Sequence, residues 1–201
     1  MTAGKPLTRA ALKAFPLPAV IDGDKESKGR IFILAGSRGV PGAALLTATA
    51  GMRVGAGKLR VGTGESVATS VGVAMPEAMV IGLAEHRDGH LARSSVKAIA
   101  EHAQEVDAIV AGPGMATGPT CSQIAKAVSD SAAQLVLDAA LLHSLRPIDA
   151  KRLPRPVLLP HAGELASLLD CDEQEIADDP VACGKRAAER FAHSARLISD
   201  A

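Results

Sequence analysis

A histidine and a glutamate lie three residues apart in the segment Pro-His-Ala-Gly-Glu at residues 160–164. The apolar residues 157–159 precede it as a buried strand would, and Pro160 ends that strand. The apolar run that Glu164 opens predicts a helix. His161 and Glu164 would therefore lie between the carboxyl end of a strand and the start of a helix. In open α/β sheets ligands bind at this edge, and helix N-termini there favour anions.

Both residues also allow a purely structural interpretation. His161 could cap the helix or lie exposed in a loop, and Glu164 could be present for the helix dipole alone. Because the two residues occur together at a strand end, we favour a functional role for the pair.

Apolar runs of strand length alternate with helical segments along the chain, which is typical of a parallel sheet covered on both faces. This pattern predicts an α/β fold in a single domain over residues 30–201, after a polar lead-in over residues 1–29. The predicted strands are 30–35, 59–63, 79–83, 107–111, 134–138 and 157–159, and the predicted helices are 43–54, 91–103, 121–131, 165–169 and 182–192.

Polar residues and glycines gather where the predicted strands end. The Gly-rich stretch 36–42 follows the first strand, Gly112-Pro113-Gly114 follows the fourth, and Asp138 ends the fifth. Since parallel strands end at one edge, these groups and His161 predict a phosphate- or nucleotide-type ligand. Asp138 could also serve as a helix cap.

None of the Gly-rich stretches has a standard nucleotide-binding spacing. Residues 36–42 do not form a dinucleotide fingerprint, and residues 51–58 do not form a P-loop. Residues 62–65 resemble a phosphate turn, but we favour a simple turn after a strand.

Composition excludes several classes of function. Lysine plus arginine and aspartate plus glutamate each number 22, so a nucleic-acid partner is not expected. Three cysteines are too scattered for a disulfide framework or a zinc site, which favours a cytoplasmic setting. A signal peptide and a membrane span are not expected. The remaining histidines show no ligand spacing and are expected on the surface: His86, His90, His102, His143 and His193.

Taken in order, these motifs resemble the ADP/ATP-dependent NAD(P)H-hydrate dehydratase family of the ribokinase-like superfamily. The resemblance covers roughly residues 25 to 190 and implies a three-layer α/β/α fold with a mostly parallel central sheet. It rests on residues 28–37, 42–44, 53–57, 75–79, 112–114, 136–139 and 160–164.

The resemblance implies a repair reaction on the hydrates of NADH and NADPH. The ring hydroxyl would be phosphorylated by ADP or ATP with Mg²⁺, and elimination of phosphate would restore the dihydropyridine. Ala43, Gly114 and His161 would contact the hydrated nucleotide. Gly36, Asp138 and Glu164 would lie near the phosphates and the metal. The family also implies a cytoplasmic homo-oligomer, often a tetramer.

The sequence departs from the family pattern at several places. Ala140 replaces a second aspartate, Ala116 replaces a glycine, and Val40-Pro41 stands where an aromatic residue is common. The family's catalytic aspartate lies in a Gly-Thr-Gly-Asp turn that these 201 residues do not contain. We therefore expect a truncated or degenerate homologue with little or no dehydratase turnover.

Two other functions remain open from the residues. One is a ribokinase-like kinase of a small hydroxylated metabolite, although such kinases more often place asparagine at the His161 position. The other is a non-catalytic nucleotide-binding or assembly protein, which the absent turn favours.

Overall fold

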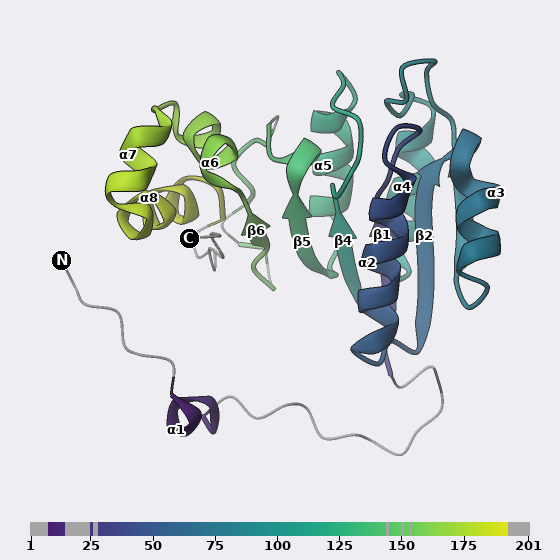
Figure 1. The fold of residues 1–201 in the computed structure, drawn as a ribbon, viewed down its shortest axis with the longest axis horizontal. Helices are drawn as coiled ribbons and strands as arrows, with labels where there is room; N and C mark the ends of the chain where they lie inside the picture. Colours follow the sequence, from purple (N-terminus) through teal and green to yellow (C-terminus); the bar gives the residue numbers. More distant parts are fainter. Residues whose placement is uncertain are drawn as a thin grey trace.

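Six parallel strands form one sheet at the centre of the molecule, in the order β3-β2-β1-β4-β5-β6 (Figure 1). The computed structural model describes residues 8–14, 25, 28–143, 145–149, 151–152 and 154–192. The strands are β1 (Arg30–Leu34), β2 (Lys58–Gly64), β3 (Met79–Leu83), β4 (Ala108–Ala111), β5 (Gln134–Asp138) and β6 (Val157–Leu159). The predicted α/β fold with a parallel sheet is confirmed.

Helices pack on both faces of the sheet and complete three layers. One face carries α2 (Pro41–Arg53) and α3 (Glu65–Ala74), and the other carries α4 (Ser95–Gln104) and α5 (Cys121–Ser129). Beside β6 lie α6 (Ala162–Leu169), α7 (Glu173–Asp178) and α8 (Pro180–Ala187), which continues as the π-helical η2 (Ala188–Ala192). The short elements α1 (Arg9–Leu12) and the 3₁₀ turn η1 (Ala139–Leu141) complete the described structure.

Alternating residues of the central strands supply two separate cores. Phe32 and Leu34 of β1 point toward α4 and α5, while Ile33 points toward α2. Ala44 and Ala48 are fully buried on α2, so this helix can pack closely against the sheet. Continuous apolar strands are thus stable here because side chains on both faces of β1 are buried.

The observed strands agree more closely with the sequence predictions than the observed helices do. Strands 79–83, 134–138 and 157–159 are confirmed to the residue. The simple turn expected over residues 62–65 is wrong, because β2 continues to Gly64 and α3 begins at Glu65. The Glu85 carboxylate accepts a hydrogen bond from the Ser66 N–H at 3.0 Å, which satisfies a free donor in the first turn of α3.

Other helices begin at a different residue from the one predicted, or have no predicted counterpart. The helix expected from residue 91 begins at Ser95, because residues 84–92 form a loop closed by a bridge between Glu85 and Leu91. Helices α3 and α7 were not predicted, and α8 begins at Pro180, where the Asp179 side chain caps it.

The surface placement expected for the histidines holds only in part. His86 and His143 are exposed, whereas His90 and His102 are half-buried, so the expectation is wrong for the latter two. The His90 ring stacks on His86 at 4.4 Å between centroids, and His102 packs beside Phe32. His193 lies outside the described residues.

Candidate functional site

The carboxyl ends of β1 and β4 form the point where the strand order reverses. From β1 the chain continues outward to β2 and β3, and from β4 it continues in the other direction to β5 and β6. Two backbone hydrogen bonds join the strand ends here: Gly36 N–H donates to the Pro113 carbonyl at 2.8 Å, and Gly112 N–H donates to the Leu34 carbonyl at 2.9 Å. A crevice at such a reversal point is the usual ligand site of an open α/β sheet.

Gly114 and Ala43, both predicted to contact substrate, lie against each other in the structure. Gly114 has φ +62°, and a Cβ atom there would lie 2.3 Å from the Ala43 Cβ and 3.3 Å from the Val40 carbonyl oxygen. The loop after β4 can approach α2 this closely only because both of these residues are small. The structure brings the two residues together, and their role in substrate binding stays a prediction.

Gly36 lies in the loop between β1 and α2, next to the loop after β4 that carries Gly114. It has φ +76°, and an added Cβ would be 3.0 Å from the Ala44 Cβ and 3.2 Å from the Thr63 Oγ1. The loop leads directly into α2, whose N-terminus has Pro41 in its first turn and no side-chain cap. An uncapped helix start beside a glycine loop suits a negatively charged ligand group.

Thr63 is a further candidate residue, which is not among those predicted from the sequence. Its side chain is fully buried, and its hydroxyl has no hydrogen-bond partner among the described residues. A threonine between two glycines at a strand end is the signal that the sequence offers, although the pattern of residues 62–65 favours a simple turn. A buried unpaired hydroxyl beside Gly36 is a candidate ligand contact.

His161 and Glu164 cap α6 reciprocally. The His161 Nδ1 accepts a hydrogen bond from Gly163 N–H at 3.1 Å, and His161 N–H donates to the Glu164 Oε2 at 3.0 Å. The His161 Nε2 lies 3.3 Å from the Glu164 Oε1, with the histidine side chain 69% exposed and the glutamate 6% exposed. The structural interpretation of the pair is therefore confirmed, and the imidazole is also accessible to a ligand.

Asp138 connects this pair to the rest of the edge. Its Oδ1 accepts a hydrogen bond from Ala139 N–H at 2.9 Å, so the predicted capping role is confirmed. Burial raises the pKa of the Asp138 carboxyl, the Ala139 hydrogen bond opposes this, and the nearby Glu164 charge adds to it. Two neighbouring carboxylates concentrate negative charge at the ends of β5 and β6.

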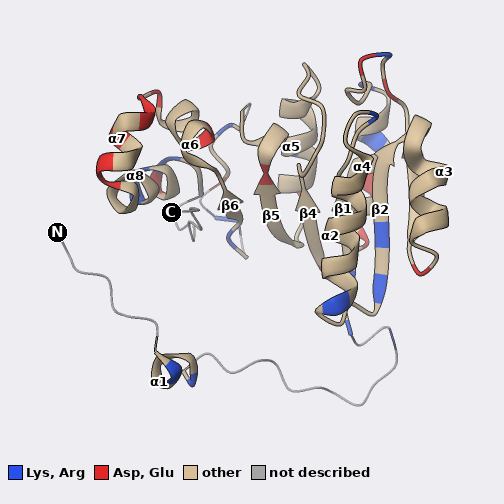
Figure 2. Ribbon diagram, in the orientation of Figure 1, with Lys and Arg blue, Asp and Glu red and all other residues tan. Residues whose placement is uncertain are grey.

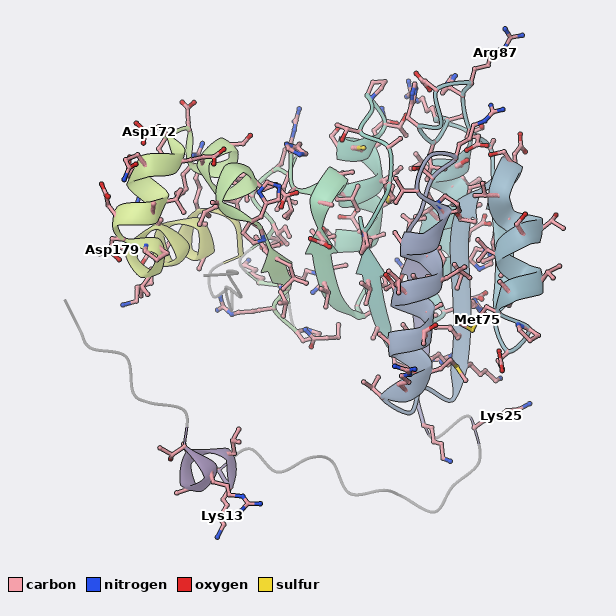
Figure 3. All side chains as sticks on the ribbon, viewed as in Figure 1. Lys13, Lys25, Met75, Arg87, Asp172 and Asp179 are labelled. Atoms are coloured by element: carbon pink, nitrogen blue, oxygen red, sulfur yellow. The ribbon has the colours of Figure 1, made fainter. Side chains whose placement is uncertain are left out.

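The six predicted site residues thus lie in two neighbouring groups at one edge. Gly36, Ala43 and Gly114 surround the reversal point, Asp138 ends β5, and His161 and Glu164 follow β6. Another motif of the resemblance, residues 75–79, lies elsewhere. In Figure 3, Met75 is at the opposite end of the sheet from Arg87, which follows the carboxyl end of β3.

No cluster of three or more potential metal ligands occurs among the described histidine, cysteine, aspartate and glutamate side chains. Within the same part of the chain, no helix is long and apolar enough to cross a bilayer.

Comparisons with known proteins agree with this fold. An ADP-dependent (S)-NAD(P)H-hydrate dehydratase from Xanthomonas campestris pv. campestris is 44% identical over 176 residues, which are 87% of this chain and 59% of that protein. A Bacillus subtilis ADP/ATP-dependent NAD(P)H-hydrate dehydratase, co-crystallized with ATP/Mg²⁺, superposes with a TM-score of 0.74 at 28% identity over 90% of this chain and 61% of its own.

A more distant structure supports the fold alone. A ribokinase-like superfamily protein from Enterococcus faecalis V583 superposes with a TM-score of 0.71 at 21% identity, over 92% of this chain and 61% of its own. The fold is therefore ribokinase-like, and the chain spans about three-fifths of the length of these three proteins. The sequence profile of the family described as NAD(P)H-hydrate dehydratase matches residues 31–196. The chain belongs to the NAD(P)H-hydrate dehydratase family.

Proposed function

We propose that the carboxyl edge of the sheet binds hydrated NADH or NADPH together with ADP or ATP, and that the chain serves in repair of these hydrates. The observation that carries the proposal is the close approach of Gly114 to Ala43 beside Gly36 at the point of strand reversal. This arrangement occurs in a chain 44% identical to a protein with that activity.

The chemistry divides into phosphorylation of the ring hydroxyl and elimination of phosphate. Hydroxide is a poor leaving group, whereas phosphate is a good one, so the first step makes the second feasible. Phosphoryl transfer is catalysed mainly by positioning and by electrostatic stabilisation. The uncapped start of α2 would hold phosphate oxygens through backbone N–H groups, and the exposed His161 imidazole would contact the hydrated nucleotide.

Mg²⁺ fits this edge as an ion shared with phosphate. Glu164 lies close enough to Asp138 for its charge to raise the pKa of the Asp138 carboxyl, and the two carboxylates are too few to form an all-protein cage. Mg²⁺ is commonly held by one or two carboxylates, water and substrate phosphates. Asp138 and Glu164 would hold it in this way, and the ion would neutralise phosphate charge.

Turnover also requires a base and an anion hole, which the resemblance places in the Gly-Thr-Gly-Asp turn. We therefore propose that the 201 residues bind both nucleotides but turn over little hydrate by themselves. The homo-oligomeric state and the cytoplasmic location implied by the resemblance also stay predictions.

A chimaera tests the proposed function. The coding sequence of the chain is joined in frame to that of the part of the Xanthomonas relative outside the matched region. The purified chimaera is then supplied with hydrated NADH, Mg²⁺ and ADP or ATP. We expect the near-ultraviolet absorbance of NADH to return. A folded chimaera that binds ADP but leaves the hydrate unchanged would contradict the proposal, and phosphorylation of a small hydroxylated metabolite would favour a kinase instead.

A further inference from the structure

A short hairpin over residues 85–91 follows the carboxyl end of β3. Its first and last residues form an antiparallel bridge. Within it, His86 N–H donates a hydrogen bond to the His90 carbonyl and Gly89 N–H donates to the His86 carbonyl, both at 2.9 Å. Arg87 lies at its tip and points away from the sheet (Figure 3). The hairpin thus stands at the same edge of the sheet as the candidate site, although it supplies none of the predicted site residues.

The hairpin packs on both of the loops that flank the point of strand reversal. An added Cβ at Gly89, which has φ +86°, would lie 3.2 Å from the Arg38 Cβ in the loop after β1. An added Cβ at Gly118, in the loop after β4, would lie 2.7 Å from the His90 Cβ and Cγ. Because it contacts both loops, the hairpin is held in place beside the candidate site.

Two imidazole rings stack across this hairpin. The His86 and His90 rings are 4.4 Å apart between centroids, with an angle of 31° between their planes. The His90 side chain is only 17% exposed, and its Nδ1 lies 2.5 Å from the Asp88 Oδ1. His86 is exposed to solvent. The pair therefore presents an accessible ring on top of a ring that its neighbours hold in place.

The described residues offer little other ring surface to a ligand at the carboxyl edge. The chain contains no tryptophan or tyrosine, and Phe32 and Phe191 are at most 5% exposed. The exposed imidazole of His161 is a single ring that already caps α6. Bases of nucleotides commonly stack on aromatic side chains, histidine included. A base bound at this edge would therefore find its stacking surface on the hairpin.

The charges of the hairpin suit a base better than a phosphate group. Figure 2 shows acidic and basic residues together in this part of the chain, and within the hairpin Glu85 and Asp88 outnumber the single arginine, Arg87. An anion is favoured instead at the uncapped start of α2. The group that contacts the two imidazoles should therefore be uncharged and flat.

We propose that the stacked imidazoles of His86 and His90 bind the adenine of the hydrated dinucleotide. This inference rests on the proposed function, which places phosphates and Mg²⁺ near Asp138 and Glu164. Those carboxylates belong to the ends of β5 and β6, whereas the hairpin follows β3, on the other side of the reversal point. A dinucleotide whose nicotinamide half lies toward His161 would extend across the reversal point, so that its adenine reaches the hairpin.

Calorimetric titration with two hydrates separates the halves of the dinucleotide. One is hydrated NADPH, and the other is the hydrate of reduced nicotinamide mononucleotide, which has no adenine. His86→Ala is expected to weaken binding of hydrated NADPH about fivefold or more and to leave binding of the mononucleotide hydrate and of ADP unchanged. His86→Phe is the matched control, because it replaces one ring with another, and we expect it to keep the affinity of the wild type.

Both variants should fold, because His86 forms its hydrogen bonds in the hairpin through backbone atoms, and thermal melts check this. Wild-type affinity for hydrated NADPH in His86→Ala would overturn the inference and leave the proposed function standing. An equal loss of affinity for both hydrates, a loss of ADP affinity, or a failure of His86→Phe to retain binding would also overturn it. If the unsubstituted chain bound neither hydrate, the inference and the proposed function would both be wrong.

Discussion

Replacing Gly112 with alanine is expected to lower the free energy of unfolding by about 2–4 kcal/mol. Gly112 has φ +120°, where a side chain is strained, and an added Cβ would lie 1.8 Å from the Asp138 carbonyl oxygen and 2.7 Å from its carbonyl carbon. These are backbone atoms at the end of β5, so the clash cannot be relieved by a side-chain rotation. The end of β5, and Asp138 with it, must move.

Urea unfolding of the purified variant measures this effect, and Gly39→Ala is the matched control. Gly39 lies in the loop after β1, and an added Cβ there would meet nothing within 4 Å. Its substitution should change the free energy of unfolding by about 0.5 kcal/mol or less. Equal stability of the two variants would show that β4 and β5 do not approach as described.

Replacing Glu164 with glutamine is expected to preserve the fold while weakening binding of Mg²⁺ and nucleotide by about tenfold or more. The glutamine oxygen can still accept the His161 N–H bond that Glu164 accepts, because either residue completes a capping box. The negative charge near the proposed phosphate position is lost. Calorimetric titration with Mg·ADP, beside a thermal melt, separates the two effects.

The same variant has a pH signature. Burial and the Glu164 charge raise the pKa of Asp138 in the folded protein. The free energy of unfolding therefore falls as the pH rises through that raised value. Removing the Glu164 charge lowers the pKa of Asp138 and reduces this loss. An unchanged Asp138 titration by carbon NMR, or full nucleotide affinity in Glu164→Gln, would contradict the assigned role.

The sheet could be predicted from the sequence because its strands are continuous apolar runs. When helices separate such a run from the other apolar runs, as for residues 134–138, few structures other than a strand fit the pattern. The sequence does not predict helix α3 because Gly62 and Gly64 favour a turn, whereas in the structure the distant Glu85 caps the helix. Such a contact between residues 19 positions apart cannot be inferred from local composition.

The candidate site was predictable in its location but not in its detailed contacts. Strand ends predicted that Gly114 and His161 would share an edge, and the resemblance added their proposed roles. That Gly114 lies against Ala43, and that Thr63 is buried without a partner, depends on how α2 packs on the sheet. Packing of this kind is set by tertiary structure, so the sequence cannot show that the Thr63 hydroxyl is buried without a partner.

The affinity of the chain for hydrated NADPH in two His161 variants tests the central claim most directly. His161→Asn keeps a side-chain acceptor suited to cap α6, whereas His161→Ala removes both the cap and the imidazole. If the exposed imidazole contacts the nucleotide, both variants lose about tenfold in affinity while only His161→Ala is appreciably less stable. Wild-type affinity in His161→Asn would contradict the account, because His161 would then act only as a helix cap.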